Sequence, residues 1–481
     1  MNLRPVFYIV GLFLIFLGAA MALPAAVDLA ADNPDWRTFA VSGVITVFMG
    51  GTLMLGCRGG IQSVGRREAF VLTALSWVVL CAFAALPLRF AGLDLSYADA
   101  YFEAMSGLTT TGSTVMTRLD DAPPGILLWR GLLQGLGGVG IIVMAVAVLP
   151  FLRVGGMQLF QAESSDRSEK ALPSPVQIAR GIGLVYVILT LATAIAFGLA
   201  GMTTLEAFVH AMTSISTGGF STSDSSIGHF ASPAIEWIAI VAMLLGSLPF
   251  VLYVRALAGA GGELFRDSQV QVFLAIVGGF AAVLAVWVHA TEAVAPWDAV
   301  RIALFNVATI ISTTGFANVD YVQWGSFFSA AIMVLTFIGG CTGSTAGAIK
   351  IFRLQIVWMT MKAQILHLVH PHAVYPMRFA GRPVSAEVAA AVTAFCFAYV
   401  LTVAALTLGL CFVGLDLVTA FSGAATALGN VGPGVGSIIG PAGNFSSLPD
   451  AAKWMLSAGM LLGRLELFTV LLMFVPRFWR A

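Results

Sequence analysis

Four short segments of the chain combine small residues with oxygen-bearing side chains and end in glycine. They are Thr110-Thr111-Gly112, Thr217-Gly218-Gly219, Thr313-Thr314-Gly315 and Asn430-Val431-Gly432. None contains a carboxylate, a cysteine or a histidine, so a cation bound there would be held by backbone carbonyl and hydroxyl oxygens, as in a potassium-type filter. The last glycine permits the positive φ that turns successive carbonyls toward an axis. One such segment would be an ordinary glycine-rich turn, whereas four favour a cation filter.

The four segments recur at a regular spacing, which predicts an internal repeat. Their last glycines, Gly112, Gly219, Gly315 and Gly432, follow one another at intervals of 107, 96 and 117 residues. Each segment follows a short amphipathic stretch and lies between two long apolar runs. Irregular backbone at membrane depth is tolerated only where it is buried in protein or lines a water-filled cavity. Four converging turns satisfy this condition around one axis, so the repeat predicts a central pore.

The composition excludes a soluble protein of several domains. Of the 481 residues, 59% are hydrophobic and 10% are charged, whereas soluble domains have roughly 25% charged residues. A bilayer-spanning helix needs about 20 mostly apolar residues. Ten such runs are expected, beginning near Val6, Phe39, Ala69, Ile126, Gln177, Ala234, Val270, Phe327, Ala386 and Ala451. The first is interpreted as a retained span and not as a cleaved signal peptide.

We therefore expect an all-α integral membrane protein with four tandem helix–pore loop–helix repeats around a pseudo-fourfold pore. An N-terminal pair of transmembrane helices is expected at residues 1–62. The four repeats are expected at residues 63–152, 170–260, 267–366 and 384–481. In the third repeat the second helix is expected to be broken.

That break is predicted from an unusual concentration of glycine in the second apolar run of the third repeat. The segment contains Gly339, Gly340, Gly343 and Gly347, interspersed with Thr342, Ser344 and Thr345 and followed by Lys350. Each glycine inside a helix costs about 1 kcal/mol relative to alanine. Tight helix packing through small residues is one interpretation. The favoured one is a mobile loop that blocks permeation under the filter, because irregular backbone at this depth must line a cavity.

Arg464 stands in the middle of the last apolar run, where an ionisable residue is costly and indicates an ion pathway and a partner. Glu466 does not share its helix face, because residues i and i+2 point in different directions. Arg464 is therefore expected to face the pore and the broken span. Two roles remain open, an electrostatic barrier to cations and an anchor for loop carbonyls, and both place Arg464 in gating.

The net charge of zero conceals an uneven distribution of 24 basic and 24 acidic residues. One set of connections carries most of the basic residues, including Arg58, Arg66, Arg67, Arg153, Arg167, Lys170, Arg180, Arg255, Arg266, Lys350, Arg353, Lys362, Arg378, Arg382, Arg477 and Arg480. Basic loops face the cytoplasm, so both termini are expected inside and the filter turns outside. The acidic residues of the outer face form a solvated rim that would also concentrate cations at the pore mouth.

Two other patterns in the sequence could belong to a disulfide, metal or cofactor site, and neither is interpreted in that way. The five cysteines are scattered and mostly apolar in context, so neither a disulfide framework nor a cysteine metal site is expected. Residues 135–140 match the glycine pattern of dinucleotide-binding proteins, but they lie inside an apolar run with no preceding strand. Helix packing through small residues explains this pattern better.

Taken together, the filter turns and four further motifs resemble the Trk/Ktr/HKT superfamily of potassium transporters, most closely its TrkH-type subunits. The further motifs are Leu136-Gly137-Gly138-Val139-Gly140, Leu245-Gly246-Ser247-Leu248-Pro249-Phe250, residues 339–350, and Gly463-Arg464-Leu465-Glu466-Leu467-Phe468-Thr469. The resemblance covers essentially the whole chain. It implies a homodimer with one pore per protomer and a cytosolic TrkA-type nucleotide-binding ring that gates the pore. In the plant branch of the superfamily, serine in the first filter turn accompanies sodium permeation. All four filter turns of this chain end in glycine, so the resemblance implies potassium as the transported ion.

The expected function is therefore potassium uptake across a bacterial inner membrane, with no cofactor bound by this chain and potassium as the substrate. A symporter that couples potassium to protons or sodium is the alternative, although the filter contains no titratable side chain. An intramembrane enzyme is disfavoured, because the spans contain neither a nucleophile with a base nor paired aspartates.

Overall fold

The computed structural model describes residues 1–58, 65–147, 175–373 and 375–480. Within these ranges the chain is helical apart from turns, loops and one two-stranded antiparallel pair, β1 (Arg378–Phe379) with β2 (Arg382–Pro383). The expected repeat boundaries at residues 62, 63, 152, 170 and 481 lie outside the described residues. So do three of the basic residues expected on the cytoplasmic side, Arg153, Arg167 and Lys170.

Three helices precede the first filter-bearing unit, and the first and third of them pack on each other through glycine. They are α1 (Arg4–Ala20), α2 (Ala22–Ala30) and α3 (Trp36–Gly56). A Cβ at Gly11 would lie 2.6 Å from the carbonyl oxygen of Gly50, and a Cβ at Gly18 would lie 2.8 Å from that of Gly43. Only glycine allows this close approach of the backbones, which is the usual way small residues join helices in a membrane.

Four further groups each contain a long helix, a short helix and a returning segment. The long helices are α4 (Arg66–Phe90), α9 (Pro175–Leu199), α14 (Ser268–Glu292) and α18 (Ala386–Phe412). The short helices are α5 (Tyr97–Leu108), α10 (Thr204–Ile215), α15 (Pro296–Ile311) and α19 (Leu417–Gly429). The returning segments are α6 (Pro124–Ala147), α11 (Pro233–Gly246) with α12 (Phe250–Arg255), α16 (Gly325–Thr336) with α17 (Ile351–Val369), and α20 (Asp450–Arg464) with α21 (Phe468–Leu471). Short helices α13 (Gly262–Arg266) and α22 (Pro476–Trp479) complete the described helices.

Local sequence signals start the short helices. Ser96 and Asp99 form a capping box at the start of α5, and Thr203 and Glu206 form another at α10. Asp416 accepts a hydrogen bond from the Thr419 N–H (3.0 Å) at the start of α19. In a capping box the side chains satisfy backbone N–H groups that have no partner within the helix. Each of these helices therefore starts at a defined residue beside the preceding long helix.

The number of membrane-crossing helices is lower than the ten expected. Within the described ranges seven helices are long and apolar enough to cross a membrane, or nine if each of two bent pairs counts as one span. The run expected from Phe327 forms α16, whose 12 residues are too few to cross. The glycine-rich residues that follow Thr336 end that helix early, which is why the tenth span is missing.

Two of the returning segments bend where the sequence predicted continuous spans. Helices α11 and α12 meet at 92°, and α20 and the segment beginning at α21 meet at 107°. Pro249 lies in the first break and restricts the residue before it to extended backbone. Glu466 lies in the second break with φ +57°. The sequence predicts a break in the third repeat but does not predict these two bends.

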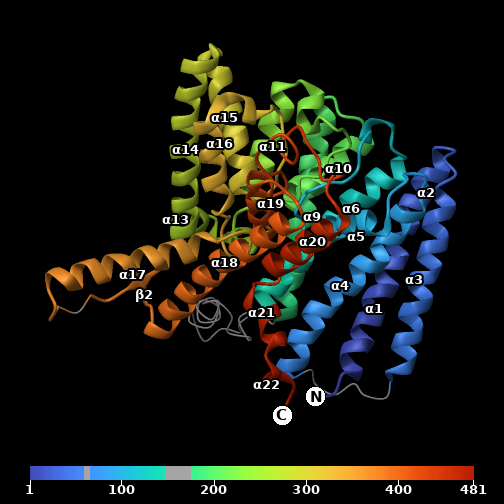
Figure 1. Cartoon of the computed structure of the whole chain (residues 1–481), viewed down its shortest axis with the longest axis horizontal. Helices are drawn as coiled ribbons and strands as arrows, with labels where there is room; N and C mark the ends of the chain where they lie inside the picture. Colours follow the sequence, from blue (N-terminus) through green and yellow to red (C-terminus); the bar gives the residue numbers. More distant parts are fainter. Residues whose placement is uncertain (59–64, 148–174, 374, 481) are drawn as a thin grey trace.

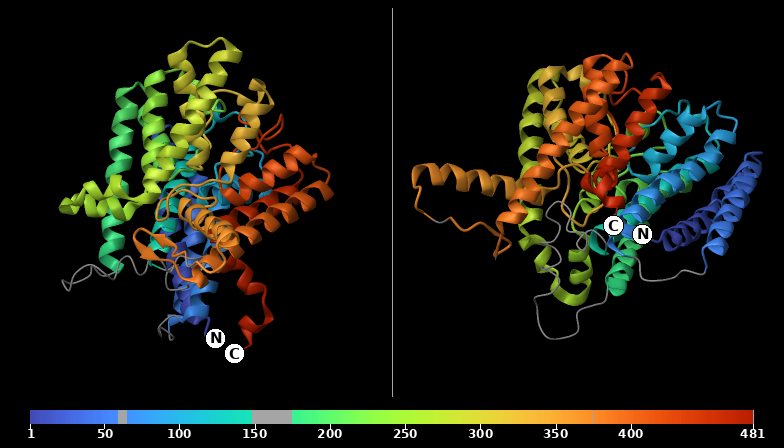
Figure 2. Two further views of the ribbon diagram at one scale, coloured as in Figure 1. Left: turned by 90° about the vertical axis from the view of Figure 1, so that its left-hand side faces the viewer. Right: turned by 60° about the horizontal axis from the view of Figure 1, so that its bottom comes forward.

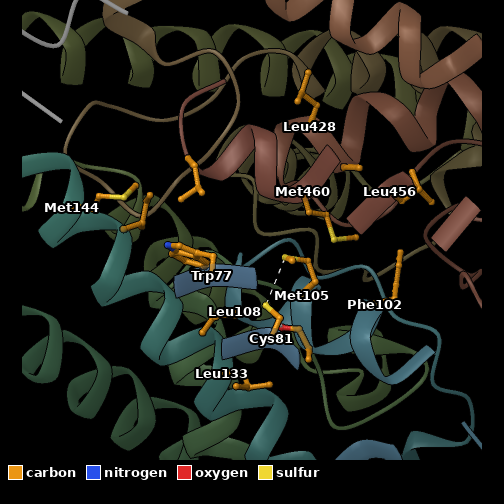
Figure 3. Packing of buried hydrophobic residues seen from close by; sticks show 14 of the residues in the cluster. Trp77, Cys81, Phe102, Met105, Leu108, Leu133, Met144, Leu428, Leu456 and Met460 are labelled. Atoms are coloured by element: carbon orange, nitrogen blue, oxygen red, sulfur yellow. Dashed lines mark hydrogen bonds between the residues drawn. The ribbon is translucent and has the colours of Figure 1, made fainter. Parts of the chain in front are cut away.

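The largest buried cluster lies around the short helix α5, which packs between α4, α6 and α20 (Figure 3). Phe102 and Met105 of α5 contact this core, with Leu133 of α6 and Met460 of α20 beside them. The Sγ of Cys81 in α4 lies 3.7 Å from the Met105 sulfur. Because a short helix buried on all sides cannot shift without opening this core, the turn at its end is held in place.

The termini lie close together at one end of the molecule, while α17 extends away from the helical body (Figure 1). The right-hand view of Figure 2 also shows α17 projecting, in orange. Several large apolar side chains of this helix are exposed, among them Trp358, Ile365 and Leu368. The short helices that lead into the four glycine turns, α5, α10, α15 and α19, lie in the body from which α17 projects.

Candidate functional site

The four predicted filter segments have one backbone conformation. Each short helix ends in a residue of left-handed conformation, with φ between 51° and 59°, at Thr110, Thr217, Thr313 and Asn430. Two residues later comes a glycine with φ of 88°, 79°, 83° or 108°. The first of these conformations costs a non-glycine residue roughly 1–2 kcal/mol. Repeating it four times indicates that the surrounding structure imposes one geometry on all four segments.

The four glycines lie against one another's segments in a closed ring. A Cβ at Gly112 would lie 2.2 Å from the carbonyl oxygen of Gly218, and a Cβ at Gly219 would lie 1.8 Å from that of Thr314. The ring closes through two further approaches, from Gly315 to the Val431 oxygen (2.1 Å) and from Gly432 to the Thr111 oxygen (2.9 Å). A methyl group at any of the four would collide with the next segment. The first and fourth segments also share a side-chain hydrogen bond, from the Asn430 amide to the Thr111 hydroxyl, across 319 residues of the chain.

Hydrogen bonds between buried side-chain hydroxyl groups hold the backbone of the first and third segments in place. The Thr111 Oγ1 shares a hydrogen bond with Thr109 Oγ1 (2.8 Å) and accepts one from the Asn430 amide (2.9 Å). In the third segment the Thr314 and Ser312 hydroxyls share a bond of 2.7 Å. Because these side chains are buried and bonded within the wall, they fix the backbone of the residue that carries them.

The second segment has no such side chain, since its middle residue is Gly218. Gln134 of α6 lies there instead. Its Nε2 donates to the Gly218 carbonyl oxygen (2.6 Å), and its Oε1 accepts from the Phe220 N–H (3.0 Å). Sequence reasoning missed this residue, although a lone amide inside an apolar run was a usable signal.

Buried basic side chains join neighbouring units on the side where the short helices begin. Arg130 of α6 is fully buried, donates to Glu103 of α5 (2.8 Å) and also donates to the carbonyl oxygen of Ser221 (2.7 Å), just after the second filter segment. Lys453 of α20 pairs with Asp99 of α5 at 2.6 Å. A buried charge that is paired and hydrogen-bonded costs much to separate. These pairs therefore tie the filter-bearing units together and were not predicted from the sequence.

The glycine-rich residues between α16 and α17 form a loop with a narrow neck. The Gly339 N–H donates to the carbonyl oxygen of Ile349 (3.0 Å), and the Ile349 N–H donates to that of Phe337 (3.2 Å). Between these ends the chain turns through Gly343 at φ +76°. We call residues 339–350 the gate loop, after the gating role that the sequence predicts for them. The residues predicted to act in gating, apart from Arg464, all belong to this loop. They are Gly339, Gly340, Gly343, Ser344, Thr345, Gly347 and Lys350.

The gate loop contacts three of the four short helices or the turns after them. The Thr345 hydroxyl lies 3.0 Å from the carbonyl oxygen of Ile215, at the end of α10, and the Ala348 N–H donates to Gly429 at the end of α19 (2.9 Å). The Gly347 N–H donates to the hydroxyl of Thr313 (2.8 Å). The loop therefore lies directly against the C-terminal ends of the helices that lead into the filter segments.

Arg464 reaches this loop from the bend after α20. Its guanidinium donates to the carbonyl oxygen of Thr345 at 2.8 Å. Its Nε and its other terminal nitrogen have no hydrogen-bond partner within the described residues. It is the last residue of α20 and not the middle of a continuous span, and a small cavity next to it is also lined by Gly347, Lys350 and Glu466.

Glu466 pairs with Arg353, the third residue of α17. Arg353 is fully buried, and its guanidinium lies 3.7 Å from the centre of the Phe395 ring. Arg353 is one of the basic residues of the connections expected to face the cytoplasm, but its side chain is buried and does not lie on a water-exposed surface. The bend after α20 thus contacts both the gate loop, through Arg464 at Thr345, and the start of the helix that follows the loop, through Glu466 at Arg353.

The glycine pattern at residues 135–140 serves packing. A Cβ at Gly137 would lie 1.8 Å from the carbonyl oxygen of Leu108, and a Cβ at Gly138 would lie 2.7 Å from the Ser216 side chain. Gly246 and Gly463 make the equivalent approaches to Ile215 and Leu428, at the ends of α10 and α19. Glycine at these positions lets three returning helices pass directly beneath the short helices.

These features define a class of protein. The chain is a multi-pass helical membrane protein in which four short helices direct their C-terminal ends, which carry partial negative charge, toward one ring of backbone carbonyls. The oxygen ligands offered there suit a cation that has lost its water.

Comparison with known proteins gives the family. Residues 37–481 match the TrkH family, described as cation transport protein. The chain is 45% identical to the Trk system potassium uptake protein TrkI of Halomonas elongata, over 99% of this chain and 97% of that protein. It is 36% identical to the Trk system potassium uptake protein TrkH of Escherichia coli, over the full length of both. The crystal structure of the potassium transporter TrkH from Vibrio parahaemolyticus superposes over the whole of both chains with a TM-score of 0.91 and 35% identity. The chain therefore belongs to the TrkH family of cation transport proteins and is not an enzyme.

Proposed function

We propose that the protein takes up potassium through a pseudo-fourfold pore built from four helix–pore loop–helix repeats. The observation that carries this proposal is the closed ring in which Gly112, Gly219, Gly315 and Gly432 each lie against the carbonyl of the next segment. The proposed ligands are the oxygens of Thr110, Thr111, Gly112, Thr217, Gly218, Gly219, Thr313, Thr314, Gly315, Asn430, Val431 and Gly432. Relatives over the full length of the chain are named as potassium uptake proteins, which supports potassium as the substrate.

We further propose that the gate loop closes this pore from the cytoplasmic side. Its bonds to the ends of α10 and α19 and to the Thr313 hydroxyl support a position below the filter. Arg464 holds the loop through Thr345, which favours the anchor role over a purely electrostatic barrier. A cytosolic nucleotide-binding ring of the TrkA type would open the loop, and the protein would act as a homodimer with one pore in each protomer.

The proposed location is the bacterial inner membrane, with both termini in the cytoplasm. The positions of the basic connections support this orientation. The chain itself is proposed to bind no cofactor, and potassium enters only as the transported ion.

Uptake of labelled rubidium into proteoliposomes at an imposed voltage tests the proposal. We expect Gly112→Ser to admit sodium, because its side chain must enter the ring, while Gly51→Ser, at a glycine with open space around it, leaves selectivity unchanged. Unchanged selectivity in Gly112→Ser would refute the filter assignment. Repeating the measurement with and without a pH gradient distinguishes a pore from the alternative, a symporter coupled to protons or sodium.

A further inference from the structure

We propose that Gln134 determines ion selectivity by fixing the carbonyl of Gly218, in place of the side chain that the second filter segment lacks. This inference rests on the proposed function, because it assigns a positioning residue to that filter. Gln134 belongs to α6, in the first repeat, and acts on the segment of the second repeat.

The middle positions of the four segments show why a substitute is needed. Thr111 and Thr314 each anchor their own backbone through a hydroxyl bonded in the filter wall, at 2.8 Å and 2.7 Å. Val431 fills the wall with a fully buried apolar side chain. Gly218 has no side chain to anchor it, and it is followed by a second glycine. Two successive glycines give the most flexible backbone of the four segments.

Gln134 supplies both missing contacts. Its amide nitrogen binds the Gly218 carbonyl oxygen at 2.6 Å, and its amide oxygen binds the Phe220 N–H at 3.0 Å, so it bridges the peptide groups on either side of Gly219. Gln134 has no exposed surface. A buried amide whose donor and acceptor are both used is strongly oriented, because any rotation leaves a buried polar group without a partner.

The backbone of Gly218 does not itself require glycine. Gly219 has φ +79°, which disfavours other residues, whereas Gly218 has no positive φ. What excludes a side chain at Gly218 is Gln134, since a Cβ there would lie 2.3 Å from the Gln134 Cδ. Glycine at 218 and glutamine at 134 therefore form one pair in which the amide occupies the space of the absent side chain.

This pair acts on selectivity through one carbonyl of the ring. The oxygen that Gln134 binds is the one that Gly112 approaches from the neighbouring segment. A cation ligand that is free to move adjusts to a smaller ion, whereas a ligand held at a fixed position does not. Loss of Gln134 is therefore expected to raise sodium uptake by a larger factor than it lowers potassium uptake.

The test uses the full chain in bacterial cells that lack their own potassium uptake, with rubidium-86 uptake measured against increasing sodium, and sodium-22 uptake measured directly. Gln134→Leu keeps a similar volume and removes both hydrogen bonds. We expect its sodium-to-rubidium uptake ratio to rise roughly tenfold, the factor that corresponds to a lost hydrogen bond of ordinary strength. Gln271→Leu, the same substitution at an exposed glutamine of α14 that bonds the Phe265 carbonyl oxygen, is the control and should leave the ratio unchanged.

A double-mutant cycle distinguishes loss of the Gln134–Gly218 interaction from general misfolding. Gly218→Ala alone should raise the same ratio, because its methyl group displaces the Gln134 amide, and Gln134→Ala alone should raise it as well, because it removes the amide. Combining it with Gln134→Ala should change the ratio by less than the sum of the single effects, since both remove one interaction. Additive effects, or a wild-type ratio in Gln134→Leu, would overturn the inference. Absence of rubidium uptake by the unmodified chain would instead refute the proposed function.

Discussion

At the scale of single residues, charged groups placed deep in the apolar body are each bonded to a specific backbone or side-chain partner. Arg464 donates to Thr345, Arg353 pairs with Glu466, and Arg130 pairs with Glu103. Such groups are expensive to bury alone. Their partners lie on other elements, so each charge links two parts of the chain that must keep their relative position.

Arg464 gives the first prediction. Arg464→Ala removes the donor to the Thr345 carbonyl, and a buried acceptor left unpaired costs about 1–3 kcal/mol. The gate loop should then open more often, giving faster rubidium flux into proteoliposomes without any regulator. Arg464→Lys separates the two roles: a charge barrier would survive the change, whereas an anchor that depends on guanidinium geometry would not. Arg477→Ala, at an exposed residue of α22, should behave like the unmodified chain, and unmodified kinetics in Arg464→Ala would remove it from the mechanism.

At the scale of elements, the gate loop is held by a few named bonds, and this makes its closure testable. Thr345→Val keeps the side-chain volume but removes the hydroxyl that lies 2.8 Å from the Gly246 oxygen and 3.0 Å from the Ile215 oxygen. We expect flux in the absence of the regulator to rise several-fold, about what one lost hydrogen bond allows. Thr342→Val in the same loop is a matched control, because the Thr342 hydroxyl has no partner among the described residues. If both variants conduct alike, the loop is packing and not a gate.

The start of α19 gives a prediction on pH. Hydrogen bonds from Thr419 hold the pKa of Asp416 below its ordinary value of 3.8. A carboxyl whose pKa is lower in the folded state stabilises the fold fully above its ordinary pKa and loses this contribution as the pH falls through the lower value. Asp416→Asn removes this titrating group. When the pH is lowered below 4, the thermal unfolding temperature of Asp416→Asn in detergent should therefore fall less than that of the unmodified chain. Asp32→Asn, at another exposed loop carboxylate, should leave the acid sensitivity intact.

At the scale of the whole molecule, the sequence predicts what depends on local signals. The four filter segments and the interruption after Thr336 follow from glycine content and regular spacing, which are properties of short stretches. Gln134 at Gly218 and Glu466 at Arg353 could not be predicted, because 84 and 113 residues separate the partners. The bend after α20 was missed for the same reason. It contains no proline or glycine, and it forms where two charged side chains contact the gate loop at Thr345 and α17 at Arg353.

The distribution of charge over the whole chain gives the last prediction, which concerns orientation. Basic connections indicate that the loop between α17 and β1 faces the cytoplasm, and the loop between α19 and α20 follows the fourth filter segment on the outer side. A cysteine introduced as Ala442→Cys should therefore react with a membrane-impermeant maleimide on intact cells. One introduced as His372→Cys should react only after the cells are opened. Both positions are exposed, and the unmodified chain measures the labelling of its native cysteines. Labelling of His372→Cys on intact cells would reverse the orientation and place the gate loop on the outer side of the filter, which is incompatible with gating by a cytosolic partner.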